Sequence, residues 1–539
     1  MTQGGDLVNL QDILKLLRSY EVFGSIGQID IKGIKYDSRC VEPGDLFICI
    51  LGFKTDGHLY AEKAVAQGAI AVLVERYIEG LDVPQIKVKD TRDAMAIVAA
   101  CFYGYPSKKL GLIGVTGTNG KTTTTYLIKY ILEKKHKVGL VGTIGNMIGD
   151  KSLPSTRTTP EAVELQEIFC QMLKEDVAYG VMEVSSHALT LKRVEGSSFD
   201  VGVYSNMSLD HLDFHKTFEA YREAKGKLFE MIGKDKKDRP QYAVINRDDQ
   251  NYEYFKSKCQ VPVYTYGIDR DCDFRAKNVQ VKDQGVSYDL EYPVASKAGD
   301  RLVGSQKLEV VSWKESLTTD LTTDDRGLTI DNDRQPTTAT ISMNLKITGL
   351  FNVYNSLAAF AVGYLEGIPT EVIKESLEVA GVPGRFEKVD LNQDFTVIVD
   401  YAHTPDSLEN VLTSAKKFVK GQIITVFGCG GDRDRTKRSL MGEAVAKYSN
   451  YSIVTSDNPR SEDPEAIIRD ILPGLDKLAA SYEVVLDRRK AIGRAIQMAK
   501  TDDLILIAGK GHETYQEIKG KTYPFDDREI VKEFLNERV

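Results

Sequence analysis

The sequence predicts an α/β protein made of three successive units, and three observations support this. Apolar strand-like runs alternate with helix-like segments along most of the 539 residues, a pattern typical of a mostly parallel sheet covered by helices. A chain of this length exceeds one hydrophobic core, so about two to four domains are expected. Changes of pattern place the predicted units at 1–105, 106–382 and 383–539.

Charge and composition argue against a nucleic-acid-binding or membrane-bound protein. The net charge is −8, with 42% hydrophobic and 27% charged residues, whereas nucleic acids and anionic membranes need broad basic surfaces. The N-terminus lacks a basic region followed by an apolar one, and no run of about 18 apolar residues could span a bilayer. The seven cysteines are scattered without a C-x-x-C pair, which indicates a reducing compartment. We therefore expect a cytoplasmic protein.

The first two units contain most of the predicted parallel strands. DLFICIL (45–51) and AIAVLV (69–74) read as strands around the helical AEKAVAQG, before the turn signal YGYPS. The second unit opens with a strand, a Gly-rich turn and an amphipathic helix over 110–135. Residues 262–345 change to alternating β segments, and we expect the polar stretch 317–340 to be an exposed insertion.

The third unit carries four strands that each end in a short polar or Gly-rich segment. TVIVD leads to YAHTPDS, IITVF to GCGGDRDRTKR, YSIVT to SDNPRSE, and LILIA to GKGHET. Open α/β sheets bind ligands at the carboxyl ends of their strands. The four segments therefore predict a ligand-binding edge in this unit.

GVTGTNGKT (114–122) predicts a phosphate-binding loop. Its glycines allow backbone N–H groups to face phosphate at the start of a helix, where Lys121 reaches the terminal phosphates and Thr122 can ligate Mg²⁺. The strict motif has glycine where this chain has Val115, so the loop is a variant. An ordinary Gly-rich turn is the alternative, and the flanking strand, helix and threonines favour nucleotide binding.

SDNPRSE predicts an anion-binding turn. Residues 457–460 follow a strand and precede a helix-like segment, and Pro459 stiffens the turn because its ring fixes φ. Arg460 can hold a carboxylate through two parallel hydrogen bonds. The alternative is that Arg460 only pairs with the nearby Glu462 or Asp463.

TGTNGKTTT (116–124) resembles the phosphate loop of the Mur ligase family, ATP-dependent amide-forming enzymes of peptidoglycan precursor synthesis. The resemblance covers nearly the whole chain and implies three domains: a UDP-binding N-terminal domain, a central ATPase domain and a C-terminal Rossmann-like domain. The other motifs occur in the family's order: EVSSHAL (183–189), NMSLDHLDFH (206–215), GLFNVYNSLAA (349–359), GRFE (384–387), DYAHTPDSL (400–408) and GKGHE (509–513).

Residues 36–60, YDSRCVEPGDLFICILGFKTDGHLY, resemble the family members that add the third residue of the peptide. These enzymes join meso-diaminopimelate or L-lysine to UDP-N-acetylmuramoyl-L-alanyl-D-glutamate through an acyl phosphate, giving the UDP-MurNAc-tripeptide, ADP and phosphate. A DNPR motif accompanies diaminopimelate in that subfamily, so the resemblance implies this amino acid. We expect the chain to act as a monomer on these small molecules.

Three alternatives stay open at this point. The same ligase could add L-lysine, and folate polyglutamylation shares the phosphate loop, although the block at 36–60 argues against it. A noncatalytic paralogue is the third alternative. The presence of Lys121, Glu183, His211 and Lys225 argues against a noncatalytic paralogue.

The resemblance implies ATP and Mg²⁺ as cofactors and a catalytic group of Lys121, Glu183, His211 and Lys225. Lys225 matches a lysine that CO₂ converts to a carbamate in this family. The alternatives without a catalytic role are a solvated strand-end carboxylate for Glu183, a loop histidine for His211 and an exposed helical lysine for Lys225. The predicted Mg²⁺ ligands are Thr122, Glu183, His211 and the Lys225 carbamate. The predicted ATP-binding residues are Gly117, Thr118, Asn119, Gly120, Lys121, Thr122, Thr123, Asn355, Arg385, Asp400 and His403.

Two further sets are implied for the other substrates. Leu191 departs from the family's pattern, because some family members have glutamine at this position. The predicted UDP-muramoyl-dipeptide set is Ser38, Phe53, Lys54, Thr55, Thr158, Thr159, Ser185 and Arg193. The predicted diaminopimelate set is Arg433, Asp457, Asn458, Pro459, Arg460, Gly509 and Glu513.

Overall fold

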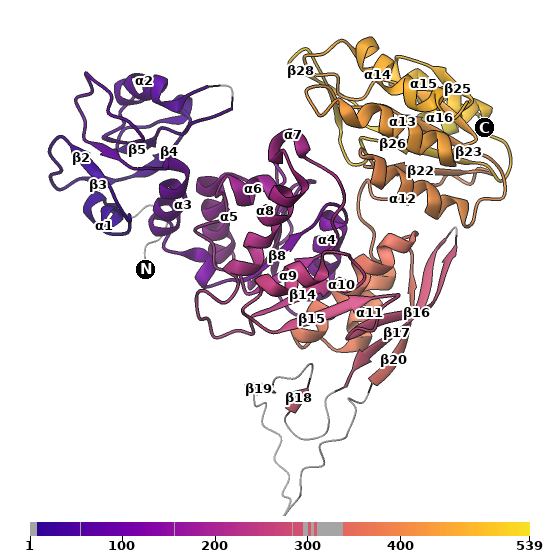
Figure 1. The fold of residues 1–539 in the computed structure, drawn as a ribbon, viewed down its shortest axis with the longest axis horizontal. Helices are drawn as coiled ribbons and strands as arrows, with labels where there is room; N and C mark the ends of the chain where they lie inside the picture. Colours follow the sequence, from indigo (N-terminus) through magenta and orange to yellow (C-terminus); the bar gives the residue numbers. More distant parts are fainter. Residues whose placement is uncertain are drawn as a thin grey trace, which may run out of the picture.

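A computed structural model describes residues 8–53, 55–155, 157–282, 284–294, 300–302, 307–309 and 338–538. It contains one large sheet in each of three domains, so the predicted three-domain α/β fold is confirmed (Figure 1). The predicted insertion at 317–340 falls outside the described residues up to position 337. Within the described part of the chain, no helix has the length and apolar character needed to cross a bilayer.

The first domain has a five-stranded sheet in the order β2-β7-β6-β5-β4. β4 to β7 pair in parallel, and β2 closes the edge antiparallel to β7. The strands are β1 (Val8–Asn9), β2 (Glu21–Phe23), β3 (Asp30–Ile31), β4 (Gly33–Lys35), β5 (Asp45–Ile48), β6 (Ala71–Val74) and β7 (Gln85–Lys87). The helices are α1 (Leu10–Leu14), α2 (Ala61–Ala66) and α3 (Thr91–Phe102).

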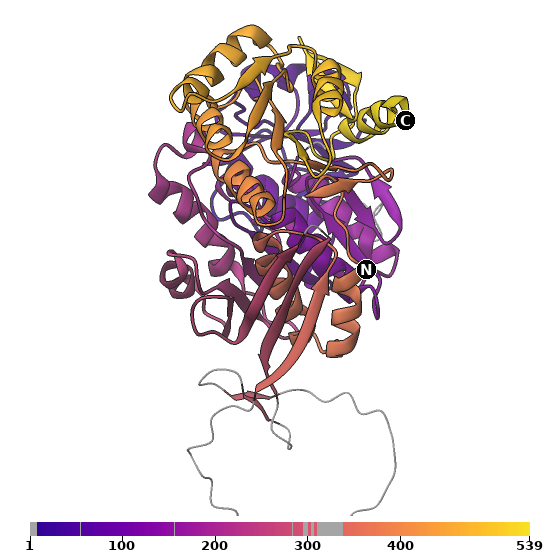
Figure 2. The same ribbon diagram turned by 90° about the vertical axis from the view of Figure 1, so that its right-hand side faces the viewer.

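The central domain has an eleven-stranded sheet in the order β11-β10-β9-β12-β8-β13-β14-β15-β16-β17-β20. Pairing is parallel from β9 to β16 and antiparallel at both ends. Figures 1 and 2 show β16, β17 and β20 side by side at one end of the sheet. The strands are β8 (Gly111–Thr116), β9 (Val138–Val141), β10 (Asn146–Ile148), β11 (Lys151–Leu153), β12 (Tyr179–Glu183), β13 (Val201–Tyr204), β14 (Tyr242–Asn246), β15 (Val263–Gly267), β16 (Phe274–Lys282), β17 (Gly285–Pro293) and β20 (Thr338–Leu345), with a separate pair β18 (Asp300–Leu302) and β19 (Lys307–Glu309).

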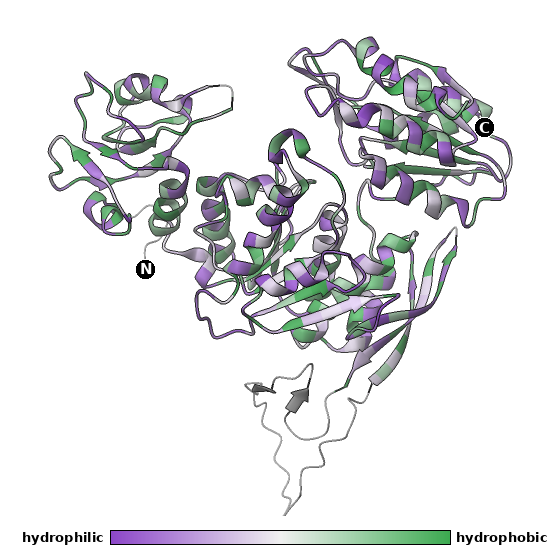
Figure 3. Cartoon of the chain, viewed as in Figure 1, coloured by the Kyte–Doolittle hydropathy of each residue, from purple (hydrophilic) through white to green (hydrophobic). Residues whose placement is uncertain are grey.

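Helices cover both faces of this central sheet, because hydrophobic side chains alternate between two clusters. One cluster contains most of α4 and α10, and the other contains α5, α8 and α9. Hydrophobic residues lie along the strands and on parts of the helices (Figure 3). The helices are α4 (Lys121–Leu132), α5 (Ala162–Lys174), α6 (Ser186–Thr190), α7 (Leu212–His215), α8 (Phe218–Met231), α9 (Tyr252–Lys258), α10 (Leu350–Leu365) and α11 (Thr370–Val379).

The third domain has a six-stranded sheet in the order β21-β22-β26-β23-β24-β25, parallel except at β21. The four predicted strands are β22, β23, β24 and β26, so their polar segments do share one edge. The strands are β21 (Glu387–Val389), β22 (Thr396–Asp400), β23 (Ile423–Phe427), β24 (Tyr451–Val454), β25 (Tyr482–Val484), β26 (Leu504–Ala508), β27 (Tyr515–Ile518) and β28 (Lys521–Pro524). The helices are α12 (Pro405–Lys416), α13 (Thr436–Tyr448), α14 (Pro464–Asp476), α15 (Arg488–Met498) and α16 (Asp527–Arg538).

A fully buried ion pair joins α15 and α16 at the carboxyl end of β26. Arg488 Nε and Nη2 donate to the two carboxylate oxygens of Asp527 at 2.8 and 2.7 Å, and Nη2 also reaches the carbonyl of Ala508 at 3.0 Å. Neither side chain is exposed. Removing one partner of such a pair leaves the other charge buried without compensation.

Arg488→Met is therefore expected to lower the free energy of unfolding by about 3 kcal/mol, because Asp527 loses its counter-charge. Urea unfolding followed by circular dichroism measures the change. Arg489→Met is the matched control, since the neighbouring Arg489 is half exposed and pairs with Glu533 at the surface. Equal losses in the two variants would contradict the assignment of the stabilisation to the buried pair.

Candidate active site

The phosphate loop lies where the sequence predicts it, between β8 and α4. Gly117 has φ +150° and Gly120 has φ +85°, values that favour glycine at Gly120. A Cβ atom at Gly117 would lie 1.9 Å from Ser205 Oγ, and one at Gly120 would lie 2.3 Å from Asn355 Oδ1. The loop glycines are therefore fixed by close packing.

Backbone and lysine hydrogen bonds shape this loop. The N–H groups of Thr118 and Asn119 donate to the carbonyl and side-chain oxygens of Asn206 at 2.8 and 3.0 Å. Lys121 Nζ donates to the carbonyls of Gly117 and Thr118 at 3.0 and 2.9 Å. Burial lowers the pKa of Lys121, and the nearby Glu183 opposes this shift. The ammonium group thus lies directly on the loop.

Thr122 and Glu183 form a pair of oxygen donors at the start of α4. Thr122 Oγ1 donates to Glu183 Oε2 at 2.9 Å, and the backbone N–H of Thr143 donates to Glu183 Oε1 at 2.8 Å. Glu183 ends β12 and is only 1% exposed. It is therefore not a solvated strand-end carboxylate. Thr123, the next residue of α4, is buried.

These oxygens fit Mg²⁺ held partly by water and phosphate. Mg²⁺ prefers oxygen ligands, keeps several waters and uses one or two carboxylates together with substrate phosphates. Among the described residues, no group of three or more His, Cys, Asp or Glu side chains is arranged as a metal site. A hydroxyl and a carboxylate beside a phosphate loop match the partial protein shell that this ion uses.

Lys225 lies inside the protein, on α8. Its side chain is only 1% exposed, so the exposed helical lysine is excluded. Nζ donates to the carbonyl of Gly117 at 2.6 Å and lies 4.6 Å from the centre of the Tyr221 ring. Burial first, and then the charge of Lys121, lower the pKa of Lys225 well below its usual value.

His211 follows β13 in a left-handed backbone conformation with φ +54°. Its ring lies 4.8 Å from the ring of His187 and 6.0 Å from that of Tyr221. His211 Nε2 is 3.5 Å from Asp210 Oδ2, and burial lowers the pKa of the imidazole. Tyr221 thus neighbours both His211 and Lys225, and its hydroxyl is 3.1 Å from Thr118 Oγ1.

The third domain brings Arg385 to the phosphate loop. Arg385 Nη2 donates to Thr122 Oγ1 at 3.0 Å, and its guanidinium lies 4.5 Å from the centre of the Tyr401 ring. Asp400 is buried and turned into its own domain, where it accepts backbone hydrogen bonds from Phe386 and Ala402 at 2.6 and 2.7 Å. Burial raises the pKa of Asp400. Of these two residues, Arg385 is the one that contacts Thr122 directly.

The two other predicted ATP residues are placed differently. His403 is exposed, with Nδ1 2.7 Å from the carbonyl of Tyr401. Asn355 is buried under the loop, where its Oδ1 accepts a hydrogen bond from Thr124 Oγ1 at 3.3 Å. Asn355 therefore supports the start of α4.

Two contacts between the central and third domains escaped the sequence analysis. Asp406 Oδ2 accepts hydrogen bonds from Asn119 Nδ2 at 2.5 Å and from Ser208 Oγ at 3.1 Å. Lys437 forms an ion pair with Asp210. Asp406 and Lys437 do lie in the predicted strand-end segments, but sequence alone does not identify their partners.

Asp406→Ala is expected to raise the KM for ATP about fivefold, because the phosphate loop loses its hydrogen bonds to the third domain. Steady-state kinetics with varied ATP measures the effect. Glu409→Ala is a matched control on the same helix, since Glu409 bonds to Tyr448 and Lys447 within the third domain. An unchanged KM for ATP in Asp406→Ala would contradict a role for this contact.

Of the predicted residues of the first domain, Phe53 contacts the central domain. Phe53 is largely exposed, and its ring packs edge-on against Phe214 at 5.8 Å. Ser38 is buried at the start of a short 3₁₀ helix, and Thr55 Oγ1 donates to Tyr60 Oη at 3.3 Å. Lys54 lies outside the described residues.

The corresponding residues of the central domain form one hydrogen-bonded group. Thr159 Oγ1 donates to the carbonyl of Glu183 at 2.8 Å and accepts from the backbone N–H of Ser185 at 3.1 Å. Arg193 donates to the carbonyl of Thr159 at 3.2 Å and pairs with Glu161 at 2.9 Å. Thr158 Oγ1 accepts from Thr143 at 3.1 Å, which links this group to Glu183.

Glu161 is the charge partner that sequence analysis missed. It also pairs with Arg92 of the first domain at 3.3 Å and with Arg157 at 3.4 Å. Three arginines therefore surround one carboxylate at the junction of the first two domains, so these four side chains carry a net positive charge. Leu191 ends α6 nearby.

The DNPR turn follows β24 as predicted, and it is mostly buried. Asp457, Asn458 and Pro459 are buried, and Arg460 is partly buried with φ +52°. Gly509 has φ +116°, and a Cβ atom there would lie 2.4 Å from Asp457 Oδ2. The glycine therefore lets two strand-end segments meet.

Arg460 has a different partner from the two acids weighed in the sequence. Its Nε lies 3.2 Å from Glu517 Oε2, and Nη1 donates to the carbonyl of Gly431 at 2.7 Å. Glu462 instead pairs with Arg438 at 2.7 Å, and Asp463 caps α14. The alternative weighed for Arg460, in which it pairs only with Glu462 or Asp463, is therefore excluded.

The remaining residues of the predicted diaminopimelate set include a hydrogen-bonded pair and an exposed arginine. Asn458 Nδ2 donates to Glu513 Oε2 at 2.8 Å, so these two side chains are brought together. Arg433 is exposed, and its Cγ lies 3.7 Å from a Cβ position built at Gly430. Arg433 thus lies over the glycine segment that also contacts Arg460.

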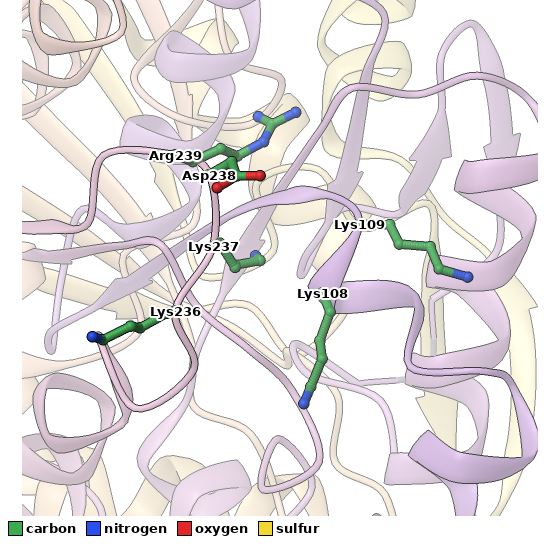
Figure 4. Close-up of a pocket in the computed structure, with 6 residues that line it drawn as sticks. All are labelled: Lys108, Lys109, Lys236, Lys237, Asp238 and Arg239. Atoms are coloured by element: carbon green, nitrogen blue, oxygen red, sulfur yellow. The ribbon is translucent and has the colours of Figure 1, made fainter. Parts of the chain in front are cut away.

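A separate cavity of about 370 Å³ lies near the amino ends of β8 and β14. Lys237 there donates to the carbonyls of Leu110 and Ser198 and to Asp200. Figure 4 shows Lys108, Lys109 and Lys236 pointing in different directions. These ammonium groups do not converge on one small anion.

Family profiles match the three parts of the chain. The Mur ligase family, catalytic domain matches residues 30–103, the Mur ligase middle domain matches 115–363, and the Mur ligase, glutamate ligase domain matches 384–511.

Individual relatives agree with these matches. The UDP-N-acetylmuramoyl-L-alanyl-D-glutamate–2,6-diaminopimelate ligase of Syntrophomonas wolfei is 45% identical over 98% of this chain and 99% of its own. The Bacillus cereus enzyme of that name is 45% identical over 95% of each chain. A solved structure of a ligase of that name has a TM-score of 0.63 at 31% identity, covering 99% of both chains. The chain belongs to the Mur ligase family.

Proposed function

We propose that this chain is an ATP-dependent ligase that joins meso-diaminopimelate to the D-glutamate of UDP-N-acetylmuramoyl-L-alanyl-D-glutamate. The products are the UDP-MurNAc-tripeptide, ADP and phosphate, in peptidoglycan synthesis. The relatives named for 2,6-diaminopimelate support the reaction. The observation that carries the choice of amino acid is the buried DNPR turn with Arg460, because diaminopimelate has a distal carboxylate that lysine lacks.

The reaction proceeds in two steps. A substrate carboxylate oxygen attacks the γ-phosphorus of ATP, so an O–P bond forms while the bond to the β–γ bridging oxygen breaks and ADP leaves. The neutral amine of the amino acid then attacks the acyl carbon, a C–N bond forms, phosphate leaves, and the nitrogen loses a proton. Lys121 and Arg385 supply positive charge beside the transferring phosphoryl group.

The Mg²⁺ set of this proposal is Thr122, Glu183, His211 and a modified Lys225. Bound Mg²⁺ would neutralise phosphate charge at the start of α4. The low pKa of Lys225 favours a neutral amine that can attack CO₂. A C–N bond forms, one C=O π bond of CO₂ opens and one nitrogen proton is lost, which turns a neutral buried amine into an anionic oxygen ligand.

The other substrates are assigned by domain. Residues 1–105 would hold the uridine diphosphate, with Ser38, Phe53, Lys54 and Thr55. Thr158, Thr159, Ser185 and Arg193 of 106–382 would hold the muramoyl dipeptide, where the three-arginine group attracts its carboxylates. Residues 383–539 would bind diaminopimelate with Arg433, Asp457, Asn458, Pro459, Arg460, Gly509 and Glu513.

The test is phosphate release from ATP with the UDP-muramoyl dipeptide present, with meso-diaminopimelate or L-lysine in parallel. We expect phosphate release with meso-diaminopimelate and none with L-lysine. Release with L-lysine alone would keep the ligase and overturn the role given to Arg460. Release with neither amino acid would favour a noncatalytic member of the family.

A further inference from the structure

Lys510 connects two of the proposed amino-acid-binding residues from inside the third domain. It follows β26, in the segment GKGHE, and its side chain is 0% exposed. Nζ donates to Glu513 Oε2 at 2.8 Å and to Asn458 Oδ1 at 3.1 Å. The ammonium group also lies 5.5 Å from the centre of the Tyr515 ring. No predicted set includes this lysine.

These contacts fix the orientation of the Asn458 amide. Its oxygen accepts from Lys510 and from the backbone N–H of Glu517 at 2.9 Å, so its NH₂ group faces Glu513 Oε2 at 2.8 Å. Glu513 Oε2 therefore receives both donors. Among the described residues, none donates a hydrogen bond to Glu513 Oε1, which is left for a ligand cation.

Lys510 also sets the charge of the site. Arg460 is paired with Glu517, so Asp457 and Glu513 are the two remaining acids of the group, and Arg433 and Lys510 are its two remaining cations; Lys510 pairs directly with Glu513. The distal end of meso-diaminopimelate carries one ammonium and one carboxylate and is neutral overall. The distal end of L-lysine is a lone ammonium, which a site with an additional negative charge would attract.

We propose that Lys510 is a positioning residue that selects a zwitterionic amino-acid end over a lone ammonium. It holds Asn458 and Glu513 in one geometry, and it cancels the charge that would otherwise favour lysine. This inference rests on the proposed function, because it concerns the amino-acid site of that reaction. Lys510 acts through Asn458 and Glu513 and does not itself need to touch the substrate.

The test compares Lys510→Met with the unaltered chain in the phosphate-release assay. We expect kcat/KM for meso-diaminopimelate to fall about ten- to a hundredfold, because a charge-assisted hydrogen-bond network is lost. The ratio of kcat/KM values for meso-diaminopimelate over L-lysine should fall by more than tenfold. The KM values for ATP and for the UDP-muramoyl dipeptide should stay unchanged.

Lys237→Met is the matched control, because Lys237 is a buried lysine paired with Asp200 far from this site. It should lower the thermal midpoint without altering the selectivity ratio. If Lys510→Met folds poorly, Lys510→Gln keeps a donor without the charge and should also lower the ratio.

An unchanged selectivity ratio in a folded Lys510 variant would overturn the inference and leave the proposed function intact. A proportional loss with every substrate would also overturn it, since that indicates a merely structural lysine. No phosphate release by the unaltered chain with either amino acid would instead reject the proposed function.

Discussion

Lys225→Ala is expected to lower kcat about a thousandfold, the scale of losing a preorganised electrostatic group at a phosphoryl-transfer site. The lysine is buried against Gly117, and its low pKa suits reaction with CO₂. Alanine removes the amine and leaves space beside the phosphate loop. Added formate or acetate should restore part of the activity if the proposed carbamate is present, because a small carboxylate can replace its oxygens.

Lys227→Ala is the matched control, since Lys227 lies on the same helix and is exposed. It should keep the activity of the unaltered chain. Full activity of Lys225→Ala, or no rescue by any small carboxylate, would contradict the carbamate proposal. Mass measurement of the intact chain with and without bicarbonate provides a second readout.

Arg460→Lys is expected to lower kcat/KM for meso-diaminopimelate about a thousandfold. Lysine keeps the positive charge but cannot form two parallel hydrogen bonds with a carboxylate. It would also lose the fixed contact with the carbonyl of Gly431. Steady-state kinetics with varied amino acid measures the loss.

Arg469→Lys provides the comparison, because Arg469 is exposed on the following helix and pairs only loosely with Asp463 at 3.6 Å. Its kinetics should match those of the unaltered chain. If Arg460→Lys reduced the use of L-lysine as strongly as that of diaminopimelate, the arginine would support the fold and not the choice of substrate.

Local sequence patterns predicted the main elements well. The strand, glycine loop and helix at 111–132 are present, and β24 and α14 flank the DNPR turn. Each of these follows from short-range signals: apolar runs, turn residues and helix caps. Parallel pairing then brings the strand ends of the third domain to one edge.

Pairings between distant residues could not be predicted in the same way. Asp406 meets Asn119 across 287 positions, and Lys510 meets Asn458 across 52. A polar residue in a turn has many possible partners, and only the folded chain selects one. Arg460 shows the same limit, since its partner Glu517 comes from β27 and not from the neighbouring acids.

Burial was the other unpredicted quantity. From the sequence, Glu183 and Lys225 fit a surface position as well as a buried one, because the identity of a single charged residue does not reveal how deeply it is buried. The structure places both within the interior. Charged residues are seldom buried without a partner. The burial of Glu183 and Lys225 therefore favours the predicted catalytic role over that of solvated surface residues.

The third domain has its own sheet and its own hydrophobic clusters, and it meets the phosphate loop through a few polar side chains. In the proposed function, the incoming amino acid is chosen in this domain, and the acid is activated at the phosphate loop of another domain. Under that proposal, substitutions in the third domain would change the amino acid that is added without repacking the nucleotide site.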